Sequence, residues 1–211
     1  METKDYLRIL KEEIHSTVFA TVDKEGLPTT RVIDIMLTDN KGIYFLTAKG
    51  KEFFQQLMEK QYVAISGMTS GEGSLNKKAI SIRGKVECIG QEFLDKIFEV
   101  NSYMAEIYPS EESRIALCVF RLYQGEGEYF DLSTKPITRN SFIIGEGYKK
   151  DNGFEMGYFI NEKCVGCGNC DRVCPQKCIN TAKLPYVISQ GNCLHCGNCM
   201  SVCKYGAVEK R

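Results

Sequence analysis

The sequence predicts two unequal domains: a larger, mainly β domain of antiparallel strands with peripheral helices, followed by a small, cysteine-rich α+β domain. Two observations lead to this prediction. Short β-rich runs separated by turn residues recur between residues 16 and 132. Nine of the eleven cysteines fall after residue 163. At 211 residues, the chain is long enough for one medium domain and one small one.

Composition limits the classes of function. Lys plus Arg and Asp plus Glu both number 27, so the overall charge indicates neither a nucleic-acid surface nor an acidic tail. No apolar run approaches the ~18 residues that a membrane-spanning helix needs. Residues 1–14 also lack the apolar core of a signal peptide. We therefore expect a cytoplasmic protein without a nucleic-acid or membrane partner.

The first domain is predicted to begin with an amphipathic helix over residues 1–14. Tyr6, Leu7, Leu10 and Ile14 fall near helical spacing, with Lys and Glu on the opposite side. Strands are then predicted wherever β-branched and aromatic residues gather between turn residues. These runs cover residues 16–22, 29–37, 43–47, 62–68, 79–89 and 116–132.

Two further helices are predicted between the strands. Residues 48–60 contain no β-branched residue, and their four largest apolar side chains share one face, which is typical of a crossover helix. These side chains are Phe53, Phe54, Leu57 and Met58. Residues 91–108 are predicted to form a second helix. Both helices are expected to pack on the strands.

A Gly-rich, polar segment at residues 145–157 separates the two domains. Such a composition is typical of a linker, because it offers few apolar side chains for burial and few restraints on the backbone. The predicted division is therefore a first domain over residues 1–144, a linker over residues 145–158 and a second domain over residues 159–211.

The second domain contains an internal repeat. The run CVGCGNCDRVC begins at Cys164, and the run CLHCGNCMSVC begins at Cys193. They agree at every cysteine and at the Gly-Asn pair before the third one. Each has the spacing C-x2-C-x2-C-x3-C, and Pro175 follows the first whereas Lys204 follows the second. Small duplicated units cannot bury a core alone, so the two copies are expected to close around something.

This spacing is the pattern of bacterial ferredoxins with two 4Fe-4S clusters, which the region resembles. Cysteines three residues apart can wrap three iron corners of one cluster, with glycines such as Gly168 and Gly197 relieving the backbone there. In those ferredoxins the fourth ligand comes from the other copy. The resemblance implies one ligand set of Cys164, Cys167, Cys170 and Cys203, and another of Cys193, Cys196, Cys199 and Cys174.

A pair of structural zinc sites is the alternative for these cysteines, but two complete four-cysteine runs favour the iron–sulfur interpretation. Three cysteines fall outside the pattern. Cys178 is expected to be a buried thiol rather than a ninth ligand. Cys88 and Cys118 are expected in the core of the first domain. His195, inside the second cysteine loop, is expected to be exposed, and His15 is expected to be structural.

The first domain resembles the pyridoxamine 5'-phosphate oxidase-like family of FMN-binding split β-barrels over about residues 1–130. The resemblance rests on the order of its motifs. They are A-T, then G-x-P, an Arg-led strand, a strand ending in Thr, a Lys just inside a helix, and a strand with G-x-x-E. It implies an antiparallel split β-barrel with peripheral helices, and a homodimer with FMN at the subunit interface.

The resemblance also implies which residues bind FMN. Three of them lie where a strand turns into a helix, and a helix N-terminus favours a phosphate there. Others are expected along the Arg-led strand, which lines the flavin ring, and on neighbouring strands. The full set is Arg31, Val32, Ile33, Asp34, Thr47, Lys49, Lys51, Ser66, Gly67 and Lys78. Ordinary solvated charge is the alternative for Arg31 and the lysines at the helix start.

Three departures argue against a true pyridoxamine phosphate oxidase. Met36 and Ala79 stand where the oxidases carry a lysine and a glutamine, and the cysteine repeat occupies the end that carries their substrate motif. We expect an oxidoreductase that passes electrons between two 4Fe-4S clusters and FMN, and on to an unidentified substrate or redox partner. No Ser/His/Asp or paired-carboxylate arrangement stands out, so no catalytic residue is assigned.

Three alternatives stay open at this point. The protein could be an electron carrier between partner proteins, with no substrate of its own. It could be a redox or oxygen sensor, although the neutral charge and the lack of a DNA-binding motif argue against this. The barrel could also bind haem or a deazaflavin in place of FMN.

Overall fold

The computed structural model describes residues 1–148 and 157–211, which form two compact units. The first unit comprises Met1–Gly71, Ala79–Tyr129 and Ser141–Tyr148. The second comprises Glu72–Lys78, Phe130–Asn140 and the described part of Lys149–Arg211. Most of the segment predicted as a linker lies outside the described residues.

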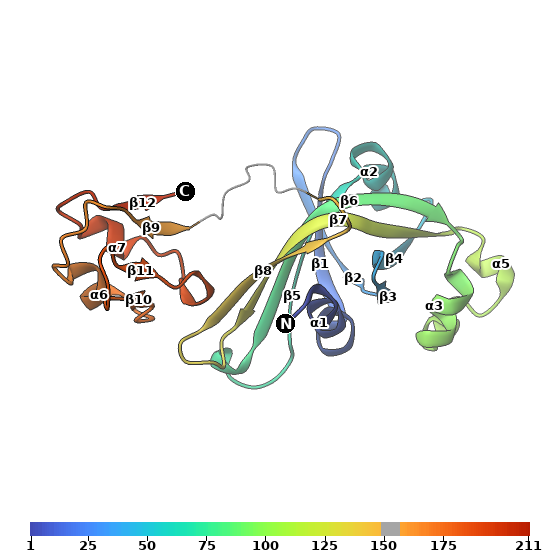
Figure 1. The fold of residues 1–211 in the computed structure, drawn as a ribbon. Helices are drawn as coiled ribbons and strands as arrows, with labels where there is room; N and C mark the ends of the chain where they lie inside the picture. The colour runs from blue at the N-terminus through green and yellow to red at the C-terminus, as the bar shows by residue number, and fades with distance from the viewer. Residues whose placement is uncertain (149–156) are drawn as a thin grey trace. The chain divides into compact units, whose positions relative to one another are not determined.

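The first unit is built on an eight-stranded sheet of order β2-β1-β5-β6-β7-β4-β3, with β8 paired to β7 (Figure 1). Its strands are β1 Ser16–Val22, β2 Pro28–Asp34, β3 Leu37–Asp39, β4 Gly42–Ala48, β5 Tyr62–Met68, β6 Lys78–Gly90, β7 Leu117–Asp131 and β8 Thr138–Ile144. The pairs β1–β2, β1–β5, β5–β6, β4–β7 and β3–β4 run antiparallel. Every strand predicted from the sequence is present, and the predicted run 29–37 is divided into β2 and β3.

Aromatic side chains from β1, β4 and β7 meet in the core. Phe19, Phe45 and Phe120 are fully buried, and their rings pack at 4.7 Å between Phe19 and Phe45 and 5.8 Å between Phe45 and Phe120. Aromatic pairs at these separations add to the stabilisation from burial itself. The predicted run is divided where the chain changes partner, because the Ile35 N–H bonds the His15 carbonyl before β1 whereas the Met36 N–H bonds the Tyr44 carbonyl of β4.

Helices pack on this sheet. The N-terminal helix is α1 Thr3–Arg8, which continues as a wider π-helical segment, η1 Ile9–Ile14. The crossover helix α2 Glu52–Lys60 lies within the range predicted for it and buries Phe53 and Leu57. Shorter helical segments are η2 Ser74–Asn76 and α5 Glu111–Arg114. Among the described residues, no helix is both long and apolar enough to cross a bilayer.

The single helix predicted over residues 91–108 is wrong, because two shorter helices occupy this range. They are α3 Leu94–Val100 and α4 Met104–Ile107. Asn101, between them, donates from its side-chain amide to the carbonyl of Ile97 at 2.8 Å and to that of Met36 at 3.1 Å. The Ile97 carbonyl also accepts the last helical bond, from the Asn101 backbone N–H at 2.9 Å. The helix α3 ends there because the Asn101 backbone, at φ −119° and ψ 69°, leaves the helical region.

The cysteine-rich part of the second unit is itself built from two similar halves. Its short strands pair as β9 Tyr158–Ile160 with β12 Val208–Lys210, and β10 Ile179–Asn180 with β11 Val187–Ile188. Its helical segments are α6 Asn169–Val173, η3 Gln190–Asn192 and α7 Asn198–Ser201. Gly168 and Gly197 precede α6 and α7 with φ of 77° and 82°. Equivalent positions of the repeat thus share a left-handed backbone that favours glycine, as predicted.

Candidate functional site

The eight cysteines of the repeat line two separate hollows in the second unit. One hollow is lined by Cys164, Cys167, Cys170 and Cys203. The other is lined by Cys174, Cys193, Cys196 and Cys199, and also by Cys178. Among the eight cysteines of the repeat, each hollow therefore takes three from one copy and the fourth from the other copy. This grouping is the same as that of the two expected ligand sets, whose metal binding stays a prediction.

Backbone N–H groups support the thiols around these hollows. The N–H of Ala207 points at Cys203 Sγ over 3.3 Å, and that of His195 points at Cys193 Sγ over 3.4 Å. Burial by itself raises the pKa of the Cys203 thiol, but the backbone N–H groups of residues 205–208 outweigh it and lower this pKa. A donor set of four thiols with such N–H groups fits an iron–sulfur cluster, which is bound by thiolates.

Cys178 lines the second hollow, and His195 directly follows Leu194, which also lines it. Cys178 is buried, as predicted, with its Sγ 3.5 Å from that of Cys174. Burial first, and then the nearby Cys174 thiol, raise the pKa of Cys178 to about 12, so it stays protonated near neutral pH. His195 is half-buried rather than exposed as predicted, because its ring packs edge-on against Tyr158 and contacts the Arg139 guanidinium.

In the first unit, three of the expected flavin-binding residues flank the junction between β4 and α2. Lys49 and Lys51 are exposed in the connection, and Lys51 immediately precedes the helix. Thr47 is buried near the end of β4, and its Oγ1 has no hydrogen-bond partner among the described residues. A buried hydroxyl without a partner costs about 1–3 kcal/mol, so a ligand that bonds Thr47 would relieve this cost.

Arg31 is held by polar side chains from β1, β2 and α2. Its guanidinium donates to the hydroxyl of Thr29 at 2.8 Å and to the side-chain carbonyl of Gln56 at 2.9 Å, and it also donates to Thr21. Its Cζ lies 4.5 Å from the centre of the Phe53 ring. Burial lowers the pKa of Arg31 somewhat, but a guanidinium remains charged at any physiological pH. Gln56 is a polar residue on the apolar face of the predicted helix, and this position could have indicated a buried polar partner.

Phe53 lies between the Arg31 guanidinium and the β4–α2 junction. Its ring packs on that of Phe45 with centroids 6.0 Å apart, and Phe45 lies two residues before Thr47 on the same face of β4. The helix α2 therefore covers the part of the core that contains both Arg31 and Thr47. A guanidinium, an unpartnered hydroxyl and two exposed ammonium groups are each of a kind that binds phosphate, and their contact with a phosphate-bearing cofactor stays a prediction.

The other expected flavin-binding residues are more dispersed. Val32 is 67% exposed on β2, whereas Ile33 packs inward against the core. Ser66 is exposed on β5, where it pairs with Val18 of β1. Lys78 begins β6 and belongs to the second compact unit. Their contact with a flavin stays a prediction.

Gly67 lies next to Ser66 and is covered by the N-terminal helical segment. A Cβ added at Gly67 would come within 2.6 Å of Ile14 Cγ2 and 2.8 Å of Thr17 Cγ2. Glycine is therefore needed at this position for close packing of η1 against β5. Any flavin contact from Gly67 would have to use its backbone.

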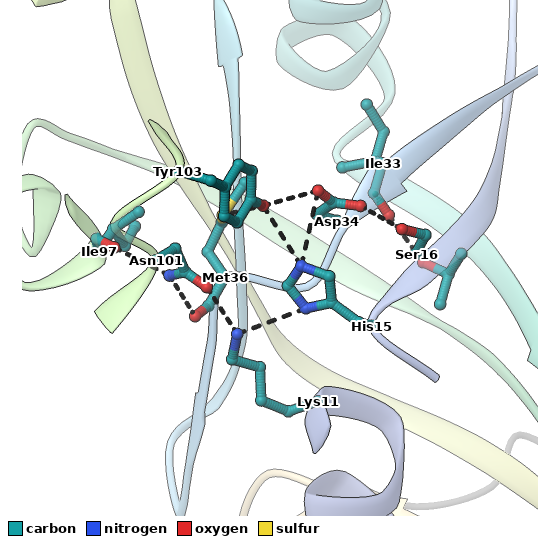
Figure 2. A network of polar contacts seen from close by, with 10 residues as sticks. Lys11, His15, Ser16, Ile33, Asp34, Met36, Ile97, Asn101 and Tyr103 are labelled. Carbon is teal, nitrogen blue, oxygen red and sulfur yellow. Dashed lines mark hydrogen bonds and ion pairs between the residues drawn. The ribbon is translucent and has the colours of Figure 1, made fainter. Parts of the chain in front are cut away.

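Asp34, at the end of β2, belongs to a polar network that sequence reasoning did not find (Figure 2). Its Oδ1 accepts from the Ser16 hydroxyl at 2.6 Å, and its Oδ2 accepts from the Tyr103 hydroxyl at 2.6 Å. His15 Nε2 lies 3.6 Å from Asp34 Oδ2 and 3.3 Å from the Tyr103 hydroxyl. Lys11 Nζ lies 3.4 Å from His15 Nδ1 and extends the network toward the N-terminal helix.

The network stabilises the ionised form of Asp34. Burial by itself raises the pKa of this carboxyl, but the hydrogen bonds from Ser16 and Tyr103 and the charges of His15 and Lys11 together lower it. Burial, and then the bond to Asp34, raise the pKa of Tyr103 well above its ordinary value, so this hydroxyl remains a donor. The members come from distant parts of the chain and form no motif. Sequence reasoning treated His15 as structural, expected Asp34 to bind FMN, and assigned no role to Lys11, Ser16 and Tyr103.

Comparison with known protein families identifies both parts of the chain. The model of the pyridoxamine 5'-phosphate oxidase family matches residues 3–128. The chain belongs to this family. The model of the 4Fe-4S dicluster domain matches residues 163–207, so this member of the oxidase family carries that domain after its barrel. Both predicted resemblances are confirmed.

Solved structures give the fold of the oxidase-family domain. A NimC/NimA family protein from Clostridium acetobutylicum has a TM-score of 0.55 and 20% identity, covering 67% of this chain and 91% of that one. The predicted antiparallel split β-barrel is thereby confirmed as the fold class. None of the curated proteins matches the chain.

Two further structures are more distant. A pyridoxamine 5'-phosphate oxidase-related, FMN-binding protein from Nostoc punctiforme has a TM-score of 0.47 and 13% identity, covering 67% of this chain and 90% of that one. A heme binding protein from Mycobacterium smegmatis has a TM-score of 0.48 and 15% identity, covering 64% of this chain and 55% of that one. The binding properties named here are those of the two proteins themselves.

Proposed function

We propose that this protein is an oxidoreductase that passes electrons between two 4Fe-4S clusters and FMN, and on to an unidentified substrate. The observation that carries the proposal is the grouping of eight cysteines around two hollows, each completed by a cysteine from the opposite copy of the repeat. Bound there, the clusters would supply single-electron transfer. Because clusters of this kind do little bond chemistry, a barrel on the same chain is a reasonable place for the partner cofactor.

Eight cysteines of the second unit are the proposed ligands of the two clusters. Cys164, Cys167, Cys170 and Cys203 would hold one cluster, and Cys193, Cys196, Cys199 and Cys174 the other. The N–H groups around Cys203 favour its thiolate, which is the form that binds iron. Cys178 stands outside the four-cysteine spacing of the repeat, so it is proposed as a thiol outside the ligand set.

The barrel supplies a cation, an unpartnered hydroxyl and two flexible ammonium groups for the phosphate of FMN. Arg31 is already oriented by Thr29 and Gln56, so little side-chain freedom is lost when it binds an anion. Thr47 would donate its unpartnered hydroxyl. Lys49 and Lys51 would add charge at the start of α2. A homodimer, a redox partner and a cytoplasmic location also belong to this proposal.

Anaerobic purification followed by metal, sulfide and flavin analysis tests both parts of the proposal. We expect about eight irons and eight acid-labile sulfides per chain, as two 4Fe-4S clusters require, with one FMN. After reduction of the clusters, the flavin absorbance should bleach within the same chain. Iron and sulfide without flavin would contradict the barrel assignment, and zinc without sulfide would contradict the cluster assignment. Bleaching of the flavin without turnover of any small oxidant would favour an electron carrier.

A further inference from the structure

Cys88 and Cys118 form a pair of thiols in the barrel that neither the cluster sites nor the flavin site uses. Cys88 lies near the end of β6 and Cys118 near the start of β7, which are neighbours in the sheet. Both are free thiols, and their Sγ atoms are 2.7 Å apart. This separation is only about 0.7 Å longer than a disulfide bond, so a small side-chain movement would join them.

The two thiols differ in their access to solvent. Cys118 is 2% exposed and belongs to the main core cluster. Cys88 is exposed, so its predicted place in the core is wrong. By the alternation of side chains along β6, Cys88 falls on the same face as the buried residues. It lies beyond Val86, however, which is the last fully buried residue of that strand. A reagent in solution can therefore reach Cys88 but not Cys118.

Their protonation also differs. Burial first, and then hydrogen bonding to Cys88, raise the pKa of Cys118 to about 12. Cys118 therefore stays a thiol near neutral pH. Because the thiolate is the nucleophile in disulfide exchange, the first reaction with an outside disulfide must occur at the accessible Cys88. Cys118 is then placed beside the modified sulfur and can resolve the intermediate.

We propose that Cys88 and Cys118 are a redox-active dithiol that exchanges with small disulfides. The Cys88 thiolate attacks one sulfur of a disulfide RSSR, so a mixed disulfide forms and one RS⁻ leaves. Cys118 then loses its proton and attacks Cys88 Sγ, which forms the protein disulfide and releases the second RS⁻. The two protons of the protein thiols pass through solvent to the two RS⁻ groups. Two protein thiols are oxidised to one disulfide, and RSSR is reduced to two RSH by the same two electrons.

The position of the pair connects it to another part of the barrel. Cys118 is the register partner of Thr47 on β4. A backbone hydrogen bond from Gly90 and, to a smaller extent, the ammonium of Lys49 favour the Cys118 thiolate, which opposes the effect of burial on its pKa. Loss of the Cys118 proton in the second step is therefore assisted from the β4–α2 junction. The exchange itself needs neither flavin nor cluster, so it goes beyond the proposed function and does not depend on it.

Peptide mapping can test this pair without interference from the cluster cysteines. Trypsin releases Cys88 as the only cysteine of residues 86–96 and Cys118 as the only cysteine of residues 115–121. The full-length protein is incubated anaerobically with glutathione disulfide, alkylated with N-ethylmaleimide at low pH and digested. We expect the two peptides to become cross-linked and to separate again after dithiothreitol. Without glutathione disulfide, N-ethylmaleimide at neutral pH should label Cys88 at least roughly ten times faster than Cys118.

Two variants test the order of the steps. In Cys118→Ser, glutathione should remain attached to Cys88, because the resolving thiol is missing. In Cys88→Ser, Cys118 should stay unmodified for as long as circular dichroism shows folded protein. Absence of the cross-link in folded wild-type protein would overturn the proposal. Glutathione attached to Cys118 in folded Cys88→Ser would also overturn it. The wild-type measurement stands even if a variant fails to fold, and a negative result leaves the iron, sulfide and flavin analysis unaffected.

Discussion

The Tyr103 hydroxyl donates to the Asp34 carboxylate over 2.6 Å, and this bond joins positions 69 residues apart. It attaches the segment between α3 and α4 to the end of β2 (Figure 2). The second oxygen of Asp34 accepts from Ser16. Both carboxylate oxygens therefore have partners within the chain, so Asp34 first of all stabilises the local structure of the strand expected to line a flavin.

Replacing Tyr103 by Phe removes this hydrogen bond and leaves Asp34 with Ser16 and His15. We expect the free energy of unfolding to fall by about 1–2 kcal/mol, since hydrogen bonds to charged groups are stronger than neutral ones and this one is partly exposed to solvent. Urea unfolding of Tyr103→Phe, Asp34→Asn and the double variant measures the coupling. Strictly additive losses would show that the two side chains do not interact.

Acid should destabilise the protein partly through Asp34. Its pKa is lowered in the folded state, so its contribution is complete above the unfolded value, near 4, and is lost as the pH falls through the lower folded pKa. Wild-type protein should therefore lose more stability between pH 5 and pH 3 than Asp34→Asn does. Urea midpoints of the apo-proteins at several pH values measure this difference. Parallel pH profiles would contradict the role given to the Asp34 carboxylate.

Replacing Thr47 by Val should have opposite effects in the absence and presence of flavin. The buried Thr47 hydroxyl has no partner within the described residues, so Val should leave the apo-protein equally stable or stabilise it by up to about 1 kcal/mol. If the hydroxyl bonds the FMN phosphate, the same change should weaken FMN binding about tenfold, since 1.4 kcal/mol is a factor of ten. Thr47→Ser keeps the hydroxyl and is the matched control. Unchanged FMN affinity in Thr47→Val would remove Thr47 from the proposed site.

Substitution of the crossed cysteines should remove one cluster at a time. Cys203→Ser should lose the cluster of the first hollow and Cys174→Ser that of the second, so each should retain about four irons per chain. Cys178→Ser is the control, because Cys178 lines the second hollow without belonging to a ligand set. It should keep about eight irons. If Cys178→Ser lost iron and Cys174→Ser did not, Cys178 rather than Cys174 would be the fourth ligand of the second cluster.

The glycines before α6 and α7 offer a matched pair of substitutions. Both have positive φ, so alanine should cost about 1–2 kcal/mol at either position. A Cβ at Gly168 would meet nothing within 4 Å, whereas one at Gly197 would lie 2.9 Å from the Tyr158 hydroxyl. Gly197→Ala should therefore lower the thermal midpoint more than Gly168→Ala. Equal shifts would mean that Tyr158 moves away without cost.

The sequence by itself determined the features that depend on near neighbours along the chain. The strands follow runs of β-branched and aromatic residues, and α2 follows a run without them. The spacing of three residues predicted that three thiols of each copy lie together, and the resemblance to two-cluster ferredoxins implied that the fourth comes from the other copy. The two glycines of the repeat were predicted for the same reason, since a tight loop needs a left-handed residue at a definite place.

Only the tertiary structure decided the features that depend on how distant strands align. The helix predicted over residues 91–108 is divided at Asn101, whose backbone is not helical and whose side chain bonds a carbonyl of Met36, 65 positions away. Cys88 and Cys118 meet because β6 and β7 are neighbours in the sheet, and one becomes exposed because the barrel ends there. Local periodicity specifies which face of a strand is apolar. It does not specify which residues of another strand lie opposite, because that register is set by the packing of the whole sheet.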